Sequence, residues 1–228
     1  MRRLFFLLLA VIVCSAGAED SLKTLKITSD TTLRSNLIVP ENTICVLKPG
    51  ITLRFDGYWG IQVQGKLVAR GRENSPIVIK GIDWNKGSEK ANWRGIEVIG
   101  ASAEAILKNC RLEGAYRNLL QESWVSIDSC RFTGNHYALY CEKNTDTQIR
   151  NAIFTDNNTA VTVDGAQPVL YDVVVRENKL GLHCISDCAV VSDGTVIEKN
   201  AADRKIETFD SQNTSSPRRV WDMLLQLF

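Results

Sequence analysis

Four asparagines recur at almost equal spacing in the second half of the chain. They are Asn135, Asn157, Asn178 and Asn200, and the intervals are 22 (157−135), 21 (178−157) and 22 (200−178) residues. A period of roughly 20–50 residues is typical of repeat proteins, in which each repeat packs only on its neighbours. We call these four residues the asparagine ladder. It predicts a solenoid with about one coil per period.

The residues around the ladder favour short strands. Apolar and polar residues alternate there at period 2, which is typical of half-buried strands. Leu112, Phe132 and Phe154 share one apolar column, and Cys110 and Cys130 share a column of small residues. No amphipathic helix separates the strands, so the pattern indicates a parallel β-helix rather than a leucine-rich or βαβ architecture. A second strand in each coil is expected to direct one apolar column inward: Ile61, Ile96, Leu119, Leu139, Val161 and Leu182.

Asparagine suits the turns of such a coil for two reasons. It tolerates left-handed φ angles better than most residues, and its amide can both donate and accept hydrogen bonds between stacked copies. We therefore expect the ladder to occupy left-handed turn positions. A second column of polar residues with the same expected role lies one turn earlier in each coil: Asn109, Ser129, Asn151 and Asp172.

The chain resembles the right-handed parallel β-helix repeat proteins of the pectate-lyase-like superfold. The resemblance is carried by the ladder, by Asn-Cys-Arg-Leu at 109–112 and Ser-Cys-Arg-Phe at 129–132, by the segment 53–71 followed by Pro-Ile-Val-Ile at 76–79, and by Trp-Arg-Gly-Ile-Glu-Val at 93–98. It implies an all-β solenoid of about eight coils. Lyases, hydrolases, esterases and proteins without known activity share this fold, so it specifies function poorly.

The N-terminal residues 1–18 are predicted to be a secretory signal peptide. Arg2 and Arg3 precede an apolar run that is too short to span a bilayer as a mature helix, and Ala16-Gly-Ala18 fits the small-residue cleavage rule. We therefore expect cleavage after Ala18 and a secreted or periplasmic protein. The β-helix domain is expected to span residues 19–200.

The C-terminal end is expected to contain a linker over residues 201–215 and a short amphipathic helix over 216–228. Ser216 and Pro217 fit the N-cap and first helical position. Trp221, Leu224, Leu225 and Phe228 share one face. This helix either caps the last coil or attaches the protein to a protein partner or a membrane surface.

Charge and cysteine content narrow the function classes. The formal net charge is +1 without blocks of like charge, so nothing favours a nucleic-acid partner. The cysteines that remain after cleavage include inward-facing residues that behave as buried thiols, whereas Cys184 and Cys188 are close enough to pair across a turn. The chain has no Cys-x-x-Cys motif and two histidines, which disfavours metal ligation by these residues.

A row of carboxylates is the first candidate site. Alignment of the coils places Glu122, Glu142 and Asp164 on the outward face of consecutive coils, about 5 Å apart. Such a row can bind Ca²⁺ or supply the carboxylate pair of a glycosidase. Tyr140 and His183 lie in the neighbouring column and are expected to bind the substrate. The alternative is that these are solvated acids at strand ends.

Aromatic residues in the first coils are the second candidate. Trp59 and Trp84 are expected to stack on sugar rings, and residues 80–93 form an inserted loop of the kind that often carries binding sites. The alternative is that these aromatic residues pack between coils. No arginine is expected over the carboxylate row, and no paired-aspartate motif of pectin-degrading hydrolases is present.

These observations favour a secreted or periplasmic β-helix protein that is not catalytic. We expect it to bind carbohydrate, with a polysaccharide as its partner, or to serve as a cell-envelope scaffold. The alternative is a polysaccharide lyase or glycoside hydrolase that uses the carboxylate row. No cofactor is expected unless that row binds Ca²⁺.

Overall fold

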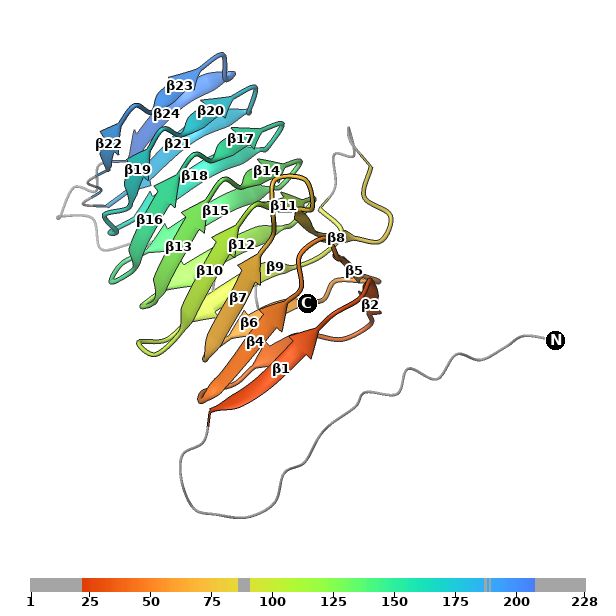
Figure 1. Ribbon diagram of the computed structural model, residues 1–228. Helices are drawn as coiled ribbons and strands as arrows, with labels where there is room; N and C mark the ends of the chain where they lie inside the picture. Colours follow the sequence, from red (N-terminus) through yellow and green to blue (C-terminus); the bar gives the residue numbers. More distant parts are fainter. Residues whose placement is uncertain (1–21, 86–90, 187, 189, 208–228) are drawn as a thin grey trace, which may run out of the picture.

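The repeat seen in the sequence appears in the computed structural model as a stack of triangular coils (Figure 1). The structure describes residues 22–85, 91–186, 188 and 190–207. Each coil contributes one short strand to each of three parallel sheets, and every strand pairs with the strand three positions away in the chain. The described part of the chain is therefore an all-β parallel solenoid of eight coils, as the ladder predicts.

The three sheets, here named A, B and C in the order in which the chain visits them, contain eight strands each. Sheet A consists of β1 (Lys23–Ile27), β4 (Thr43–Leu47), β7 (Lys66–Arg70), β10 (Glu104–Lys108), β13 (Trp124–Asp128), β16 (Asp146–Arg150), β19 (Val169–Tyr171) and β22 (Val191–Asp193). Sheet B consists of β2 (Thr31–Leu33), β5 (Thr52–Phe55), β8 (Ile77–Gly81), β11 (Cys110–Glu113), β14 (Arg131–Thr133), β17 (Ile153–Thr155), β20 (Val174–Arg176) and β23 (Val196–Glu198). Sheet C consists of β3 (Leu37–Val39), β6 (Gly60–Val63), β9 (Gly95–Ile99), β12 (Arg117–Gln121), β15 (Tyr137–Glu142), β18 (Thr159–Asp164), β21 (Leu180–Ile185) and β24 (Ala202–Glu207).

The solenoid continues beyond the boundary expected at Asn200. β24 pairs with β21 in parallel register, so part of the expected linker 201–215 is the last strand of sheet C. A terminal strand binds its single neighbour through backbone hydrogen bonds and needs no apolar face, which is why its polar sequence resembles a linker. The predicted signal peptide and C-terminal helix lie outside the described residues. Within the described residues, no helix is long and apolar enough to cross a membrane.

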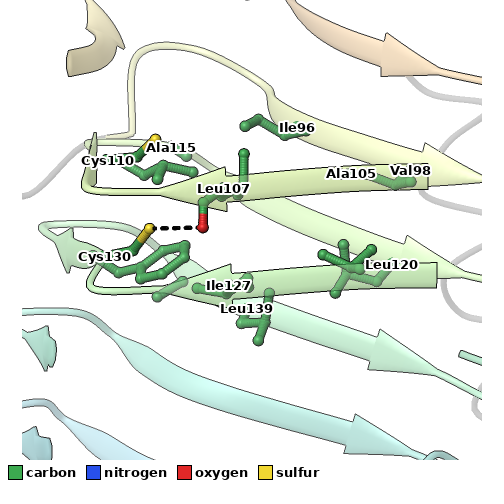
Figure 2. Close-up of a cluster of buried hydrophobic side chains, with 14 of the residues drawn as sticks. Ile96, Val98, Ala105, Leu107, Cys110, Ala115, Leu120, Ile127, Cys130 and Leu139 are labelled. Atoms are coloured by element: carbon green, nitrogen blue, oxygen red, sulfur yellow. Dashed lines mark hydrogen bonds between the residues drawn. The ribbon is translucent and has the colours of Figure 1, made fainter. Parts of the chain in front are cut away.

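The interior is filled by stacked columns of like side chains. Phe132 lies on Phe154 with ring centroids 4.6 Å apart, and Phe55 lies on Trp93 at 5.1 Å. Leu107, Cys110 and Cys130 illustrate the same stacking in the middle coils (Figure 2), where the Cys130 thiol donates to the Leu107 carbonyl. Cys184 and Cys188 form a disulfide. The described free thiols are all buried: Cys45, Cys110, Cys130 and Cys141.

The asparagine ladder lies inside the corner between sheets B and C. Asn157 is 2% exposed. Its Nδ2 donates hydrogen bonds to the Phe132 carbonyl and to Asn178 Oδ1. Its Oδ1 accepts hydrogen bonds from the backbone N–H and the side-chain amide of Asn135. The same pattern continues from Asn178 to Asn200. Each side chain therefore satisfies backbone groups that the tight corner leaves without strand partners.

The expectation that the ladder occupies left-handed positions is wrong. Positive φ angles occur instead at the residue before each ladder asparagine, namely at Gly134, Asp156, Glu177 and Lys199. The ladder position is selected for a buried amide that bonds along the stack, not for its backbone conformation.

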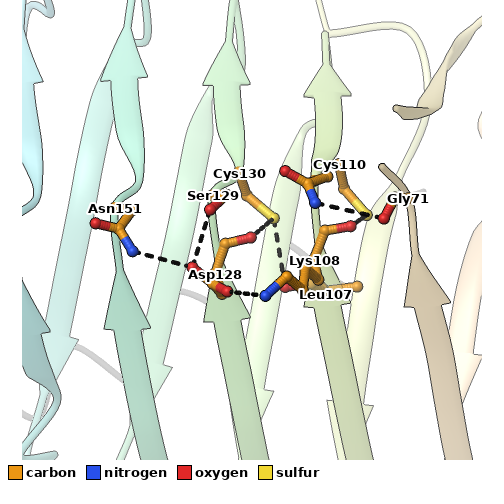
Figure 3. A network of polar contacts seen from close by, with 9 residues as sticks. Gly71, Leu107, Lys108, Cys110, Asp128, Ser129, Cys130 and Asn151 are labelled. Atoms are coloured by element: carbon orange, nitrogen blue, oxygen red, sulfur yellow. Dashed lines mark hydrogen bonds and ion pairs between the residues drawn. The ribbon is translucent and has the colours of Figure 1, made fainter. Parts of the chain in front are cut away.

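Left-handed φ does occur in the second polar column, at the corner between sheets A and B. Asn109, Ser129, Asn151 and Asp172 have φ angles of 47, 54, 51 and 52°. Figure 3 shows how side chains link this corner: Asp128 accepts hydrogen bonds from Ser129 and Asn151 and forms an ion pair with Lys108. This corner is open to solvent, so its residues need only accept the left-handed backbone conformation of the turn.

Candidate functional site

The predicted carboxylate row loses one member because coil four is one residue shorter in sheet C. β12 has five residues and β15 has six, and the register shifts by one residue between Arg117 and Leu119. A shift of one residue moves side chains to the opposite face of a sheet. Leu120, not Leu119, therefore pairs with Val98 and Cys141 and belongs to the core.

The shift removes Glu122 from the row. Gln121 pairs with Ile99 and precedes Glu122, which lies beyond the strand in a left-handed turn with φ 49°. Glu142 still lies opposite Asp164 on the neighbouring strand, and Ile185 lies opposite Asp164 on the strand after that. Two carboxylates on adjacent coils are thus all that the predicted row retains.

The remaining carboxylates, Glu142 and Asp164, lie near a phenol and not in a cluster that could hold a metal ion among the described residues. Burial, together with the negative charges of Asp164 and Glu142, raises the pKa of Tyr140 well above its ordinary value, so its phenol stays protonated. Within the described part of the chain, no group of three or more His, Cys, Asp or Glu side chains is arranged to hold a metal ion. The pair therefore has no third acidic or histidine ligand among the described residues.

His183 lies beyond this pair and makes a separate contact. It pairs with Thr162 and Lys205 in the outward column of sheet C, and its Nε2 lies 3.0 Å from Glu207 Oε1. Tyr140 lies two coils away in the same column. The structure therefore places both residues on the outer face of sheet C, as the alignment predicts, but does not bring them together.

The two tryptophans proposed for sugar stacking differ in accessibility. Trp84 is 6% exposed and lies against the corner between sheets B and C, where a Cβ at Gly114 or Gly134 would collide with its ring. Its face is covered by the protein. Trp59 is 40% exposed at the start of the same corner and keeps a surface for a ligand.

A group of residues that the sequence reasoning did not single out follows this corner. Each lies one position after the buried corner residue of its coil, so the group points outward along five consecutive coils. We call it the corner track: Arg94, Tyr116, His136, Asn158 and Lys179. Four strand spacings of ~4.8 Å give it a length of about 19 Å. Tyr58 and Trp59 extend it by one coil.

Aromatic rings form the centre of the corner track. Tyr116 and His136 are stacked with centroids 5.2 Å apart and an interplanar angle of 5°. Tyr58 contacts Tyr116 edge-on at 6.1 Å, and Tyr137 contacts both Tyr116 and His136 edge-on. Tyr140 extends the cluster onto sheet C and lies under the Arg117 guanidinium, 5.5 Å from its ring. The rings hold one another in place, so little side-chain entropy is lost when a ligand binds.

Polar groups border these rings. Gln62 donates to Glu97, which lies 3.8 Å from the Arg94 guanidinium. The Asn158 amide lies 2.5 Å from His136 Nδ1. Burial and the neighbouring Lys179 lower the pKa of His136, so the ring is neutral at pH 7 and its Nδ1 accepts from the amide. The corner track therefore combines apolar ring faces with hydrogen-bond donors and acceptors.

The sequence did contain a signal for the corner track. The position after Asn135, Asn157 and Asn178 is His136, Asn158 and Lys179, and the shorter fourth coil supplies Tyr116 after Ala115. Reading the residue after each ladder position would have found the column.

Comparison of the chain with models of known protein families, with curated proteins and with solved structures found no match. The class of protein therefore rests on the observed architecture: a parallel β-solenoid of eight coils with an aromatic and polar track along one corner.

Proposed function

We propose that this is a secreted or periplasmic protein that binds carbohydrate without turning it over, and that the corner track is its binding surface. The observation that carries the proposal is the row of partly exposed rings along consecutive coils. Sugar rings present an apolar C–H face and a rim of hydroxyl groups. Fixed aromatic faces beside amide, guanidinium and carboxylate groups match both features.

The linear form of the corner track favours an extended ligand. Its residues come from successive coils, so equivalent contacts are offered at each step along the solenoid axis. A polysaccharide can use several such contacts at once, whereas a monosaccharide can use one or two. We therefore expect affinity to rise with oligosaccharide length until about 19 Å of chain is bound.

The carboxylate pair supports catalysis less well. A retaining glycosidase needs two carboxyl groups about 5–5.5 Å apart on either side of the scissile bond, one of them an acid with a raised pKa. Glu142 and Asp164 lie opposite each other on adjacent strands of one sheet face, so they do not flank a bond from two sides. An envelope scaffold that binds glycan through the corner track is compatible with the same surface.

The proposal is tested by screening the purified protein against a polysaccharide panel, with and without Ca²⁺, for binding and for new reducing ends or unsaturated products. Tyr116→Ala is expected to weaken binding about tenfold, because an aromatic contact contributes roughly 1–1.5 kcal/mol. Trp124→Ala is the matched control, since Trp124 is an exposed aromatic residue on sheet A, away from the corner track.

Two results would contradict the proposal. Equal loss of binding in Tyr116→Ala and Trp124→Ala would show that the corner track is not the site. Turnover of a polysaccharide that Glu142→Gln abolishes would replace non-catalytic binding with the lyase or hydrolase alternative.

A further inference from the structure

The outer face of sheet A carries an apolar patch that runs from the second coil to the fifth. Val46 lies opposite Val68, and Val68 lies opposite Ile106, so the three form one column. Their side chains point away from the core, because the residues on either side of each are buried. We call this surface the sheet A patch: Ile44, Val46, Val68, Ile106 and Trp124. All five are at least partly exposed, and Trp124 is 36% exposed.

The strands do not require apolar side chains at these positions. The same column continues with Ser126 and Gln148 in the fifth and sixth coils, so the sheet accepts polar residues there. Val68 and Ile106 therefore keep apolar surface in contact with water that a serine or glutamine would avoid. An apolar patch rimmed by polar residues is typical of an interaction site.

The border of the patch is cationic. The first four coils present five cations and one carboxylate on this face: Lys26, Lys48, Lys66, Arg70, Lys108 and Glu104. The last four coils present one cation and three carboxylates: Arg150, Asp128, Asp146 and Asp193. The net charge is thus +4 (5−1) on the half that carries most of the patch and −2 (1−3) on the other half. The neighbouring corners add Arg72 and the carboxylates Glu41 and Glu73, which leave the first half cationic. Asp30, at the edge of the first coil, binds Arg54 of sheet B instead.

An anionic phospholipid bilayer fits both features of this surface. Its headgroups attract lysine and arginine, and the zone beneath them accepts valine, isoleucine and tryptophan side chains. The strands β4, β7, β10 and β13 lie side by side in one layer (Figure 1), so the patch and its cations can meet one membrane plane together. A second copy of the chain on the same patch would instead bring two cationic borders together. We propose that the sheet A patch docks the protein on anionic membrane surfaces.

This docking is independent of carbohydrate binding. In a triangular coil, the corner between sheets B and C lies opposite sheet A. The corner track therefore points away from a bilayer that contacts the sheet A patch, and a glycan can bind there at the same time. Failure of either proposal leaves the other standing.

Vesicle cosedimentation of the full chain tests the docking. The probes are vesicles of phosphatidylcholine with and without phosphatidylglycerol at physiological ionic strength. Phosphatidylglycerol is expected to raise the partition coefficient about tenfold, because each cation near the surface adds to the attraction. Lys48→Glu combined with Arg70→Glu should abolish this gain.

Arg111→Glu combined with Arg131→Glu is the matched control. It makes the same change in net charge at two exposed arginines on adjacent strands of sheet B, and should retain the gain. Tryptophan fluorescence gives a second reading: the emission should shift to shorter wavelength on phosphatidylglycerol vesicles, and Trp124→Phe should remove the shift. All variants keep the same chain ends, so differences between them arise on the faces that were changed.

Equal loss in the two double variants, or no preference for phosphatidylglycerol, overturns the proposal. An emission shift that persists in Trp124→Phe overturns it as well, because another tryptophan would then meet the bilayer. Sedimentation velocity covers the other occupant of the patch. A dimer that Ile106→Lys dissolves would assign the patch to a second copy of the chain and overturn docking on the bilayer.

Discussion

At the scale of single residues, two of the three corners of each coil use polar side chains for different reasons. The corner between sheets A and B is exposed and needs residues that accept left-handed φ, such as Asn151. The corner between sheets B and C is buried and needs an amide that serves neighbouring coils, such as Asn157. The same residue type therefore meets a conformational demand at one corner and a hydrogen-bonding demand at the other.

Removing a ladder amide is expected to be costly. Asn157→Ala leaves the Asn135 backbone N–H and the Phe132 carbonyl without their side-chain partner in a buried corner. Unsatisfied buried groups cost about 1–3 kcal/mol each, so we expect a loss of about 3 kcal/mol in the free energy of unfolding. Denaturant unfolding measures it. Asn158→Ala, one residue further and partly exposed, should cost less than about 1 kcal/mol; equal effects would contradict the role of the ladder.

His136 is expected to make stability depend on pH. Its pKa in the folded protein lies below the ordinary ~6.5, because burial and Lys179 disfavour the cation. As the pH falls through ~6.5, the unfolded chain binds this proton before the folded chain does. Stability therefore decreases from pH 7 downward and levels off below the folded pKa. An NMR titration of the His136 ring should show a midpoint below 6.5.

A variant pair isolates this contribution. His136→Gln should lose this part of the pH dependence, whereas His183→Gln should keep it. A His136 midpoint at or above 6.5 would contradict the neutral ring that accepts from Asn158.

At the scale of elements, the short strand β12 sets which side chains of the fourth coil face the core in sheet C. β12 has one residue fewer than β15, and the shift exchanges which of two consecutive leucines faces the core. Asn118 is buried at the shift and compensates for it: its Oδ1 accepts from the Ile96 N–H, and its Nδ2 donates to the Ala138 carbonyl. A polar residue therefore keeps the backbone paired where the repeat is irregular.

Substitution of the two leucines tests the register. Leu120→Ala is expected to destabilise the protein by about 2–5 kcal/mol, because it creates a cavity in the core. Leu119→Ala should cost less, because this side chain is buried on the outer face of sheet C and lies outside the core cluster. Denaturant midpoints compare the two variants directly. The register is wrong if Leu119→Ala proves the more damaging.

The sequence predicts regular coils better than irregular ones. Where the period is constant, from Asn135 to Asn200, the alternation identifies inward columns such as Phe132 and Phe154, and the structure confirms them. Alignment by similarity places Leu119 with Leu139, because nothing local reveals that coil four lacks one residue. That single omission turns a row of three carboxylates into a pair.

At the scale of the whole molecule, the coils of the solenoid surround one continuous hydrophobic core. Cys45, Cys110, Cys130 and Cys141 lie in that core from the second coil to the fifth, and each is at most 2% exposed. They therefore report on the integrity of the core from the second coil to the fifth. The Cys184–Cys188 disulfide lies in the seventh coil, and the last coils line a partly open pocket of about 90 Å³.

The four core thiols are expected to react only on unfolding. Burial raises the pKa of Cys45 and of Cys141 to about 12, and thiol reagents attack the thiolate. Ellman's reagent at pH 8 should therefore detect none of them in the native mature protein and all four in denaturant. Rapid reaction under native conditions would contradict the closed core.

The corner track, finally, is a property of the whole stack because each of its residues comes from a different coil. The direct test is an NMR titration of the protein with the oligosaccharide that binds best in the panel. We predict shift changes at Tyr116, His136, Asn158 and neighbouring coils along one corner, with Trp124 unaffected. Changes confined to Glu142 and Asp164, or to sheet A, would contradict carbohydrate binding by the corner track.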